Sequence, residues 1–144
     1  MENKLPAPAP VITADTAAFW AATKNGVLSL QRCSACERTI WYPKAFCNSC
    51  GSFDITPFEA TGLGEIYSFT QVHRGETAYR EVASFVLAMV ELDEGVRMLT
   101  NIVTTDPATL RIGQRVSVVF DDAGESASLP RFQPIHSDLE AVNG

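Results

Sequence analysis

The chain has little positive charge and no long apolar segment. Its 144 residues include 11 Lys and Arg against 17 Asp and Glu, which gives a net charge of −6. Proteins that bind nucleic acids need clustered cations to contact phosphates, so this balance argues against a nucleic-acid partner. The longest apolar run, Ala83 to Val90, is less than half of a membrane span. Because the first residues also lack the apolar core of a signal peptide, we expect a cytoplasmic protein that makes no contact with a membrane.

Residues and motifs typical of catalysis are also scarce. The two histidines, His73 and His136, are far apart in the sequence, and no nucleophile elbow, phosphate-binding loop, dinucleotide fingerprint or zinc-protease motif occurs. Two carboxylate pairs, Asp93-Glu94 and Asp121-Asp122, lie at predicted turns, where solvated side chains are the simpler interpretation. The sequence therefore predicts a chain that binds or scaffolds rather than an enzyme that acts alone.

Four cysteines form the strongest chemical pattern. Cys33-x2-Cys36 is followed, after ten residues, by Cys47-x2-Cys50. In a reducing compartment these thiols are ligands rather than disulfides, and two facing CxxC turns supply the tetrahedral thiolate set that structural Zn²⁺ prefers. Four thiolates leave no coordination position for a substrate, so we expect a structural metal. A rubredoxin-type iron site uses the same ligands, and the residues alone leave zinc and iron open.

The segment that contains the cysteines is more basic than the rest of the chain. Four cations stand between residues 24 and 50 against the single anion Glu37, namely Lys24, Arg32, Arg38 and Lys44. A basic region on an acidic protein attracts small polyanions, so these four side chains are candidate contacts for a ligand such as a nucleotide pyrophosphate. The alternative interpretation is a set of solvated side chains around the metal site.

One short helix is predicted within residues 13–26. Thr13 or Asp15 would cap it, and Asn25-Gly26 would end it. Its large apolar residues, Phe19 and Trp20, are adjacent. They either pack on the remainder of this chain or dock the helix on a partner, because so short a helix is unstable without packing.

The rest of the chain is predicted to be strands and turns. Residues 1–12 form a Pro-Ala arm that we expect to be flexible, and residues 27–60 form a zinc ribbon. The ribbon is predicted to have a strand that begins at Val27, a second over Thr39 to Tyr42 that ends at Pro43, and a third over Phe53 to Phe58. Residues 61–136 predict a five-stranded Greek-key barrel of the OB type, and residues 137–144 a frayed tail. The five strands of the barrel are predicted over Glu65–His73, Val82–Leu92, Val96–Val103, Val116–Phe120 and Ser128–Ile135. The fold class is thus mostly β, with an N-terminal helix, a zinc ribbon and an OB-fold barrel.

Several of these motifs together resemble the DUF35 family. The likeness begins with the helix and the CxxC-x10-CxxC ribbon, and it continues through Gly64 to Thr70 and Val72 to Arg74. Further matching segments are Val90–Arg97, Leu99–Asn101, Ile112-Gly113, Val116–Phe120 and Leu129–Pro134. The loop Gly75 to Glu81 and the proline-rich arm match no pattern of the family.

The resemblance implies a rubredoxin-like zinc ribbon joined to an OB barrel, acting as a non-catalytic subunit. Family members assemble with thiolase-superfamily enzymes such as thiolases, acyltransferases and thiolase-like aldolases, and help to shape the entrance for CoA and the acyl chain. The implied metal ligands are Cys33, Cys36, Cys47 and Cys50. A hetero-oligomer with a thiolase-like subunit is therefore expected, with a CoA thioester at a shared interface. On charge alone, the candidate contacts for the CoA phosphates are Lys24, Arg32, Arg38 and Lys44.

Three other functions fit parts of the pattern. A stand-alone acyl-CoA-binding protein would need the same basic segment but no partner. A single-stranded nucleic-acid-binding OB protein would use exposed rings for stacking, and the candidates are Tyr67, Phe69, Tyr79 and Phe85. Electron transfer would require iron in place of zinc.

Overall fold

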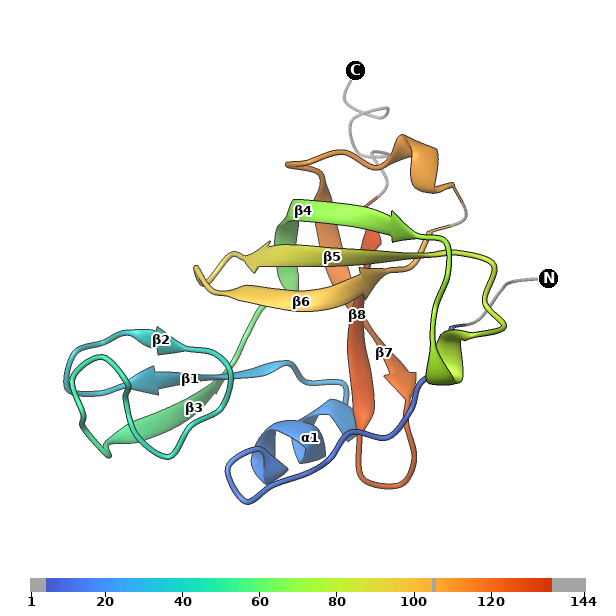
Figure 1. Cartoon of the computed structure of the whole chain (residues 1–144). Helices are drawn as coiled ribbons and strands as arrows, with labels where there is room; N and C mark the ends of the chain where they lie inside the picture. Colours follow the sequence, from blue (N-terminus) through green and yellow to red (C-terminus); the bar gives the residue numbers. More distant parts are fainter. Residues whose placement is uncertain (1–4, 105, 136–144) are drawn as a thin grey trace.

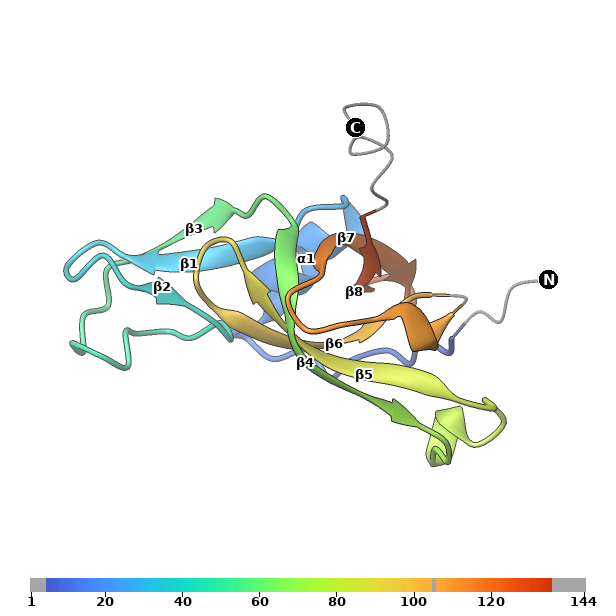
Figure 2. The same cartoon turned by 90° about the horizontal axis from the view of Figure 1, so that it is seen from above.

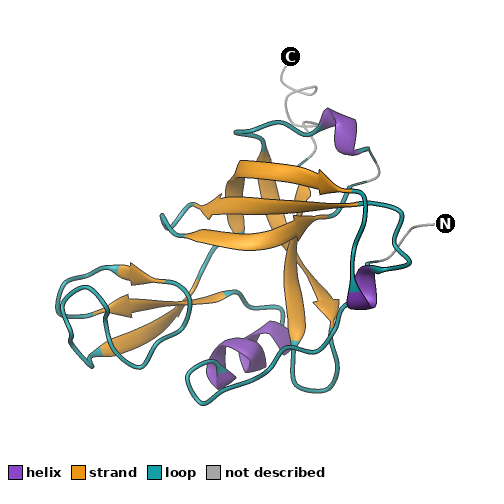
Figure 3. Ribbon diagram, viewed as in Figure 1, coloured by secondary structure: helices purple, strands orange, loops and turns teal. Residues whose placement is uncertain are grey.

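The computed structural model describes residues 5–104 and 106–135. It consists mainly of strands, arranged as a small three-stranded sheet and a closed barrel, with one α-helix between them (Figures 1 and 3). The predicted mostly-β fold class is confirmed. His136 and the predicted tail at 137–144 lie outside the described residues. No helix in the described part of the chain is long and apolar enough to cross a membrane.

The helix α1 (Ala17–Lys24) is shorter than the sequence predicts. The prediction of Thr13 or Asp15 as its cap is wrong, because Thr16 occupies that position. Instead of capping the helix, the Thr16 hydroxyl oxygen accepts a hydrogen bond from the Thr13 amide at 3.0 Å, which closes a separate turn before the helix. Phe19 and Trp20 are buried in the main hydrophobic core, so the interpretation that they pack within this chain is the correct one.

The small sheet is antiparallel and has the order β2-β1-β3, with β1 (Ser29–Cys33) in the centre. Its neighbours are β2 (Thr39–Ile40) and β3 (Ile55–Glu59). The predicted strand over Thr39 to Tyr42 is too long, because Trp41 and Tyr42 leave the sheet and pack their rings at 5.0 Å and 6.2 Å from the ring of Phe19. Aromatic packing against α1 thus takes the place of strand pairing after Ile40.

The barrel has the strand order β4-β5-β6-β8-β7 and closes through β4 and β7. Its strands are β4 (Leu63–Val72), β5 (Phe85–Leu92), β6 (Arg97–Ile102), β7 (Arg115–Asp122) and β8 (Ser128–Pro134). β5 and β6 form the predicted hairpin. β6 and β8 run parallel and pair at Ile102 and Phe132, and this pairing completes the closed barrel.

Alternating side chains fill the barrel. Every second residue of β5 is buried, beginning with Val86, and this pattern places the apolar side chains of the strand inside. Gly64 starts the pairing of β4 with β5, and a Cβ at this position would lie 2.5 Å from the carbonyl oxygen of Glu91. The close approach of these two strands therefore requires glycine.

The helix α1 lies between the ribbon and the β7–β8 end of the barrel (Figures 1 and 2). Its buried Thr23 hydroxyl donates to the carbonyl of Trp20 at 2.6 Å and accepts from the amide of Ser128 at 2.9 Å. These hydrogen bonds fasten the helix to β8, and the aromatic residues of the helix contact those of the ribbon.

Two short 3-10 turns, η1 (Thr77–Tyr79) and η2 (Pro107–Thr109), lie in the connections between barrel strands.

Candidate functional site

The ribbon brings the four cysteine sulfurs into one cluster. All four sulfur atoms lie within 4.8 Å of one another, with Cys33 and Cys50 at 3.5 Å and Cys36 and Cys47 at 3.7 Å. Zn–S bonds of about 2.3 Å at tetrahedral angles place sulfurs about 3.8 Å apart, so the observed spacing fits a zinc ion. Disulfide sulfurs are bonded at about 2.05 Å, and the four cysteines are free.

Backbone amides around the cluster favour thiolates at two positions. The amide of Cys36 donates to the sulfur of Cys33 at 3.5 Å, and the amide of Ser49 donates to the sulfur of Cys47 at 3.4 Å. Hydrogen bonds from the backbone of Cys36 and Ala35 lower the pKa of Cys33. The backbone of Cys50 and Ser49 lowers the pKa of Cys47 to about 6.

The thiol of Cys50 differs from those of Cys33 and Cys47, because its pKa is raised. The backbone of Ser52 lowers the pKa of Cys50, but hydrogen bonds to the sulfurs of Cys33, Cys36 and Cys47, together with burial, outweigh it and raise this pKa to about 12. The raised pKa of Cys50 disfavours a fourth thiolate beside the other sulfurs. A divalent cation would supply the missing charge, which is the chemistry expected of a structural thiolate site.

The four candidate phosphate contacts lie on two different parts of the molecule. Lys24 makes an ion pair with Asp122 at 2.5 Å and donates to the carbonyl of Gly124 at 2.9 Å, so it fastens α1 to the β7–β8 turn. The other three belong to the ribbon. Arg32 stacks at 4.3 Å over the ring of Phe58, and Arg38 is exposed. The main chain of Lys44 exchanges two hydrogen bonds with the side chain of Gln31.

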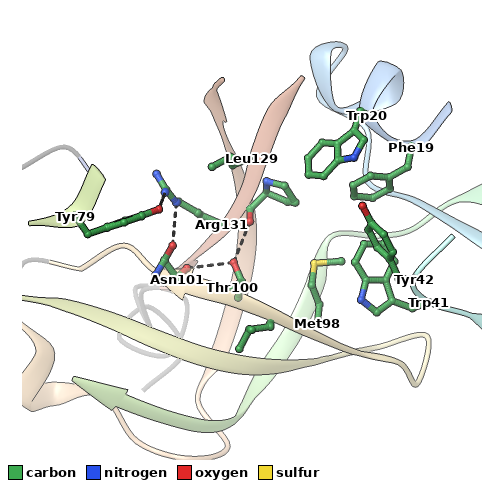
Figure 4. Close-up of a pocket in the computed structure, with 12 residues that line it drawn as sticks. Phe19, Trp20, Trp41, Tyr42, Tyr79, Met98, Thr100, Asn101, Leu129 and Arg131 are labelled. Carbon is green, nitrogen blue, oxygen red and sulfur yellow. Dashed lines mark hydrogen bonds between the residues drawn. The ribbon is translucent and has the colours of Figure 1, made fainter. Parts of the chain in front are cut away.

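A pocket of about 370 Å³, which we call the junction pocket, lies where α1, the segment after β2 and the strands β6 and β8 meet (Figure 4). Its aromatic side comes from α1 and from the segment after β2, and its polar side from β6, β8 and η1. The lining residues are Phe19, Trp20, Trp41, Tyr42, Tyr79, Met98, Leu99, Thr100, Asn101, Leu129, Pro130 and Arg131. None of the four candidate cations is among them.

Arg131 occupies the polar end of the junction pocket and is almost fully buried. Its Nη1 lies 2.6 Å from a carboxylate oxygen of Asp121, and its Nε donates to the Asn101 side chain at 3.2 Å. Its Nη2 donates to the Tyr79 hydroxyl at 3.0 Å and to the carbonyl of Pro6 at 2.5 Å. The proline-rich arm and the loop that contains Tyr79 therefore meet at one buried guanidinium group.

Sequence reasoning missed both Arg131 and the pocket. A charged residue between Pro130 and Phe132 on a strand is expected to face solvent, and nothing in the local pattern predicts its burial. The sequence did contain one signal for the pocket, which is the two pairs of adjacent aromatic residues, Phe19-Trp20 and Trp41-Tyr42. Adjacent large aromatic residues in a helix and at the end of a strand indicate a packing surface.

The two carboxylate pairs singled out in the sequence and His73 do not form an acid–base site. Asp93 pairs with Arg115, whose hydrogen bonds lower the pKa of that carboxyl. A carboxylate oxygen of Glu94 accepts from the amide of Thr61 at 2.9 Å, and Asp121 and Asp122 form the ion pairs given above. His73 is exposed.

The rings proposed for stacking on bases do not make a common platform. Tyr67 is exposed, but the guanidinium group of Arg97 covers its face at 3.7 Å from the ring centroid. Phe69 packs against the core, and Tyr79 and Phe85 pack on each other at 5.0 Å. These four rings therefore do not form the stacking surface that the nucleic-acid hypothesis requires of them.

Two family models match most of the described chain. Residues 20–56 match the model described as "ChsH2, rubredoxin-like zinc ribbon domain", and residues 59–121 match "ChsH2, C-terminal OB-fold domain". The two matches cover the cysteine cluster and four of the five barrel strands.

Curated relatives carry two kinds of name. A "Probable enoyl-CoA hydratase alpha subunit" of Thermomonospora curvata is 38% identical over 127 residues, which are 88% of this chain and 40% of that protein. The chain thus spans two fifths of the length of this relative. A "DUF35 domain-containing scaffold protein" of Methanothermobacter thermautotrophicus is 30% identical over 96 residues, which are 65% of this chain and 71% of that protein.

A solved structure matches over nearly the whole fold. It is described as "Ltp2-ChsH2(DUF35) aldolase", its matching chain is 38% identical, and the TM-score is 0.78 over 87% of this chain and 98% of that chain. The sulfur cluster, the barrel and these similarities agree, and the chain belongs to the DUF35 family, with the zinc-ribbon and OB-fold domains of the ChsH2 type.

Proposed function

We propose that this chain is a non-catalytic accessory subunit of a thiolase-superfamily acyl-CoA enzyme. The similarity to the "Ltp2-ChsH2(DUF35) aldolase" carries the proposal, because it covers 98% of the matching chain, whose description pairs two proteins in one aldolase. The subunit would stabilise the assembly and shape the entrance for CoA and the acyl chain, while the partner would supply the reacting groups.

The chemistry of the described residues supports a scaffold. The cysteine sulfurs gather in one cluster with the spacing of a closed metal site, which leaves none of them for nucleophilic attack. The carboxylates at the two candidate pairs bind cations or amides rather than each other, so they lack the arrangement of a general acid and base.

We propose zinc as the metal, held by Cys33, Cys36, Cys47 and Cys50. Bound zinc would neutralise the thiolates and hold the short strands β1 to β3 in place, since so small a sheet buries little apolar surface. The chain's own part is to preset the four sulfurs and to stabilise two of them through backbone amides.

We also propose that the phosphates of CoA contact the ribbon through Arg32, Arg38 and Lys44, at an interface shared with the partner. Their side chains belong to one small module and are not joined to a carboxylate in any ion pair of the described residues. Lys24 is the weakest of the four candidates, because Asp122 and Gly124 already hold its ammonium group.

Co-purification from the native host tests the partner. A tagged chain should recover a thiolase-like protein in a stable hetero-oligomer, and that complex should process acyl-CoA while the isolated chain does not. Recovery of the chain only as a free monomer, or thioester turnover by the chain alone, would contradict the proposal.

Calorimetry with CoA separates the accessory subunit from a stand-alone carrier. We expect weak CoA binding to the isolated chain and tighter binding to the complex. The double variant Arg38→Gln and Lys44→Gln should weaken binding to the complex about tenfold, whereas Arg111→Gln on the barrel should not. Tight binding to the isolated chain would favour the carrier.

A further inference from the structure

The strand β4 is longer than its pairing with β7. It runs from Leu63 to Val72 and pairs with β5 along almost all of this length. It pairs with β7 only from Leu63 to Glu65, and the turn before β7 adds two hydrogen bonds to the backbone of Ile66. From Ser68 to Val72, β4 therefore has a neighbouring strand of the described chain on one side only, which is β5 (Figure 2). We call the other side of this stretch the open edge.

The register of the barrel strands shows which backbone groups lie on the open edge. The amide of Leu92 donates to the carbonyl of Val96 at 2.8 Å, so Leu92 and every second residue before it in β5 bond toward β6. Phe69 and Gln71 of β4 are opposite two of these residues, and their own N–H and C=O groups therefore point away from β5. None of these four groups takes part in a hydrogen bond in the described part of the chain.

The open edge lacks the features that keep exposed strands from pairing. Its sequence, Ser-Phe-Thr-Gln-Val, contains no charged residue and no proline, and Phe, Thr and Val favour strands. The bulge of β4 lies before this stretch, between Ile66 and Ser68. Ser68, Thr70 and Gln71 are exposed, so a second strand has access to them. An edge with free backbone groups and no such protection is a place where a further strand adds to a sheet.

The open edge is complementary to a second copy of itself in the antiparallel direction. When Thr70 lies on a two-fold axis, Phe69 of each copy is opposite Gln71 of the other, and their free N–H and C=O groups bond to one another. Thr70 is then opposite Thr70, which is a favourable cross-strand pair. The charges agree as well, because Glu65 precedes the edge, Arg74 follows it, and both are exposed. Antiparallel pairing brings the acidic end of one strand to the basic end of the other.

From these observations we propose that two copies of this chain pair through their open edges, antiparallel and with Thr70 on the two-fold axis. The strands β4, β5 and β6 of both copies then form one continuous sheet. A short edge buries less than the roughly 1,200–2,000 Å² of a stable interface, so the dimer is weak and depends on concentration. The inference is independent of the proposed function, because every residue that it uses belongs to this chain.

Sedimentation velocity of the full chain over a range of concentrations tests the pairing. We expect the mass to rise from that of one chain toward that of two. Thr70→Lys and Thr70→Glu each place like charges opposite one another on the axis, and each should weaken association about tenfold. An equal mixture of these two variants should associate again, because Lys then lies opposite Glu. Gln133→Lys adds the same charge at an exposed position of β8 and should associate like the unmodified chain.

Amide hydrogen exchange of the unmodified chain, resolved by residue, tests the hydrogen bonds without any variant. The amides of Phe69 and Gln71 should exchange about tenfold more slowly at a concentration that favours the dimer than at one that favours the monomer. The amide of Thr70 bonds to β5 and should be protected at both concentrations. A constant monomer mass, no recovery in the mixture of variants, or protection of Phe69 and Gln71 only when a different protein is bound would overturn the proposal.

Discussion

The Nη1 of Arg131 lies 2.6 Å from a carboxylate oxygen of Asp121, and the Arg131 side chain is 2% exposed. This ion pair joins the neighbouring strands β7 and β8 at the polar end of the junction pocket. The same guanidinium group binds Asn101 of β6, Tyr79 of η1 and Pro6 of the arm. One side chain therefore ties together segments that are distant in the sequence.

Removing the charge of Asp121 should destabilise the chain strongly. Asp121→Asn leaves a buried cation without its counterion, and we expect the free energy of unfolding to fall by about 3 kcal/mol in denaturant titrations. Glu91→Gln is the matched control. It makes the same change in the exposed pair with Arg97, whose atoms are 3.6 Å apart, and should cost less than about 1 kcal/mol. Similar losses for the two variants would show that the buried pair has no special role.

The hydroxyl of Thr23 should contribute through hydrogen bonds rather than packing. Thr23→Val keeps the shape of the side chain but leaves the buried amide of Ser128 without its acceptor, so we expect a loss of about 2 kcal/mol in stability. Thr70→Val on the exposed face of β4 should change stability by less than about 0.5 kcal/mol. Equal stability of Thr23→Val and the unmodified chain would contradict the role of this contact in holding α1 on β8.

Metal analysis should find one equivalent of zinc and no iron in the purified chain. Cys47→Ser should lose the metal, and amide hydrogen exchange should then show loss of protection in β1 to β3. Ser49→Ala keeps the backbone amide that binds the sulfur of Cys47 and should retain the metal. A metal-free Cys47→Ser chain that keeps a protected ribbon and full activity with its partner would refute a structural role for the metal.

The ion pair of Asp93 and Arg115 should make stability depend on acid pH. Hydrogen bonds from Arg115 lower the pKa of Asp93 below its ordinary value of 3.8, so the folded state binds this proton more weakly than the unfolded state. The contribution is complete above pH of about 4 and disappears as the pH falls through the lowered pKa.

Comparison with Asp93→Asn measures this contribution. Because the pair is substantially exposed, we expect the variant to be less stable by less than about 1 kcal/mol at neutral pH, and the difference should disappear as the pH falls through the lowered pKa of Asp93. A difference that stays constant across this range would show that Asp93 acts through something other than its charge.

Local patterns in the sequence were sufficient to predict the ribbon and the barrel. Ligand spacing depends on residues a few positions apart, and the two CxxC turns around Cys33 and Cys47 predict a cluster whatever surrounds it. Strand composition is equally local, and the almost continuous apolar run from Phe85 to Leu92 predicts the strand β5 from its own residues. The turn at Asp93 to Gly95 likewise predicts the hairpin from its own residues.

Local patterns failed where a residue's partners are distant in the sequence. Thr39 to Tyr42 has the composition of a strand, yet the rings of Trp41 and Tyr42 leave the sheet for Phe19 on α1. Lys24 looks like a free cation near the metal site, yet Asp122 of β7 binds it.

The sequence by itself determined the class of fold and the cluster of thiols, because periodicity and ligand spacing are properties of neighbouring residues. Only the tertiary structure decided that Arg131 is buried and that the junction pocket lies between α1, the ribbon and the barrel. Burial of a charge depends on whether an opposite charge and several oxygens arrive from other segments, and no local pattern contains that information.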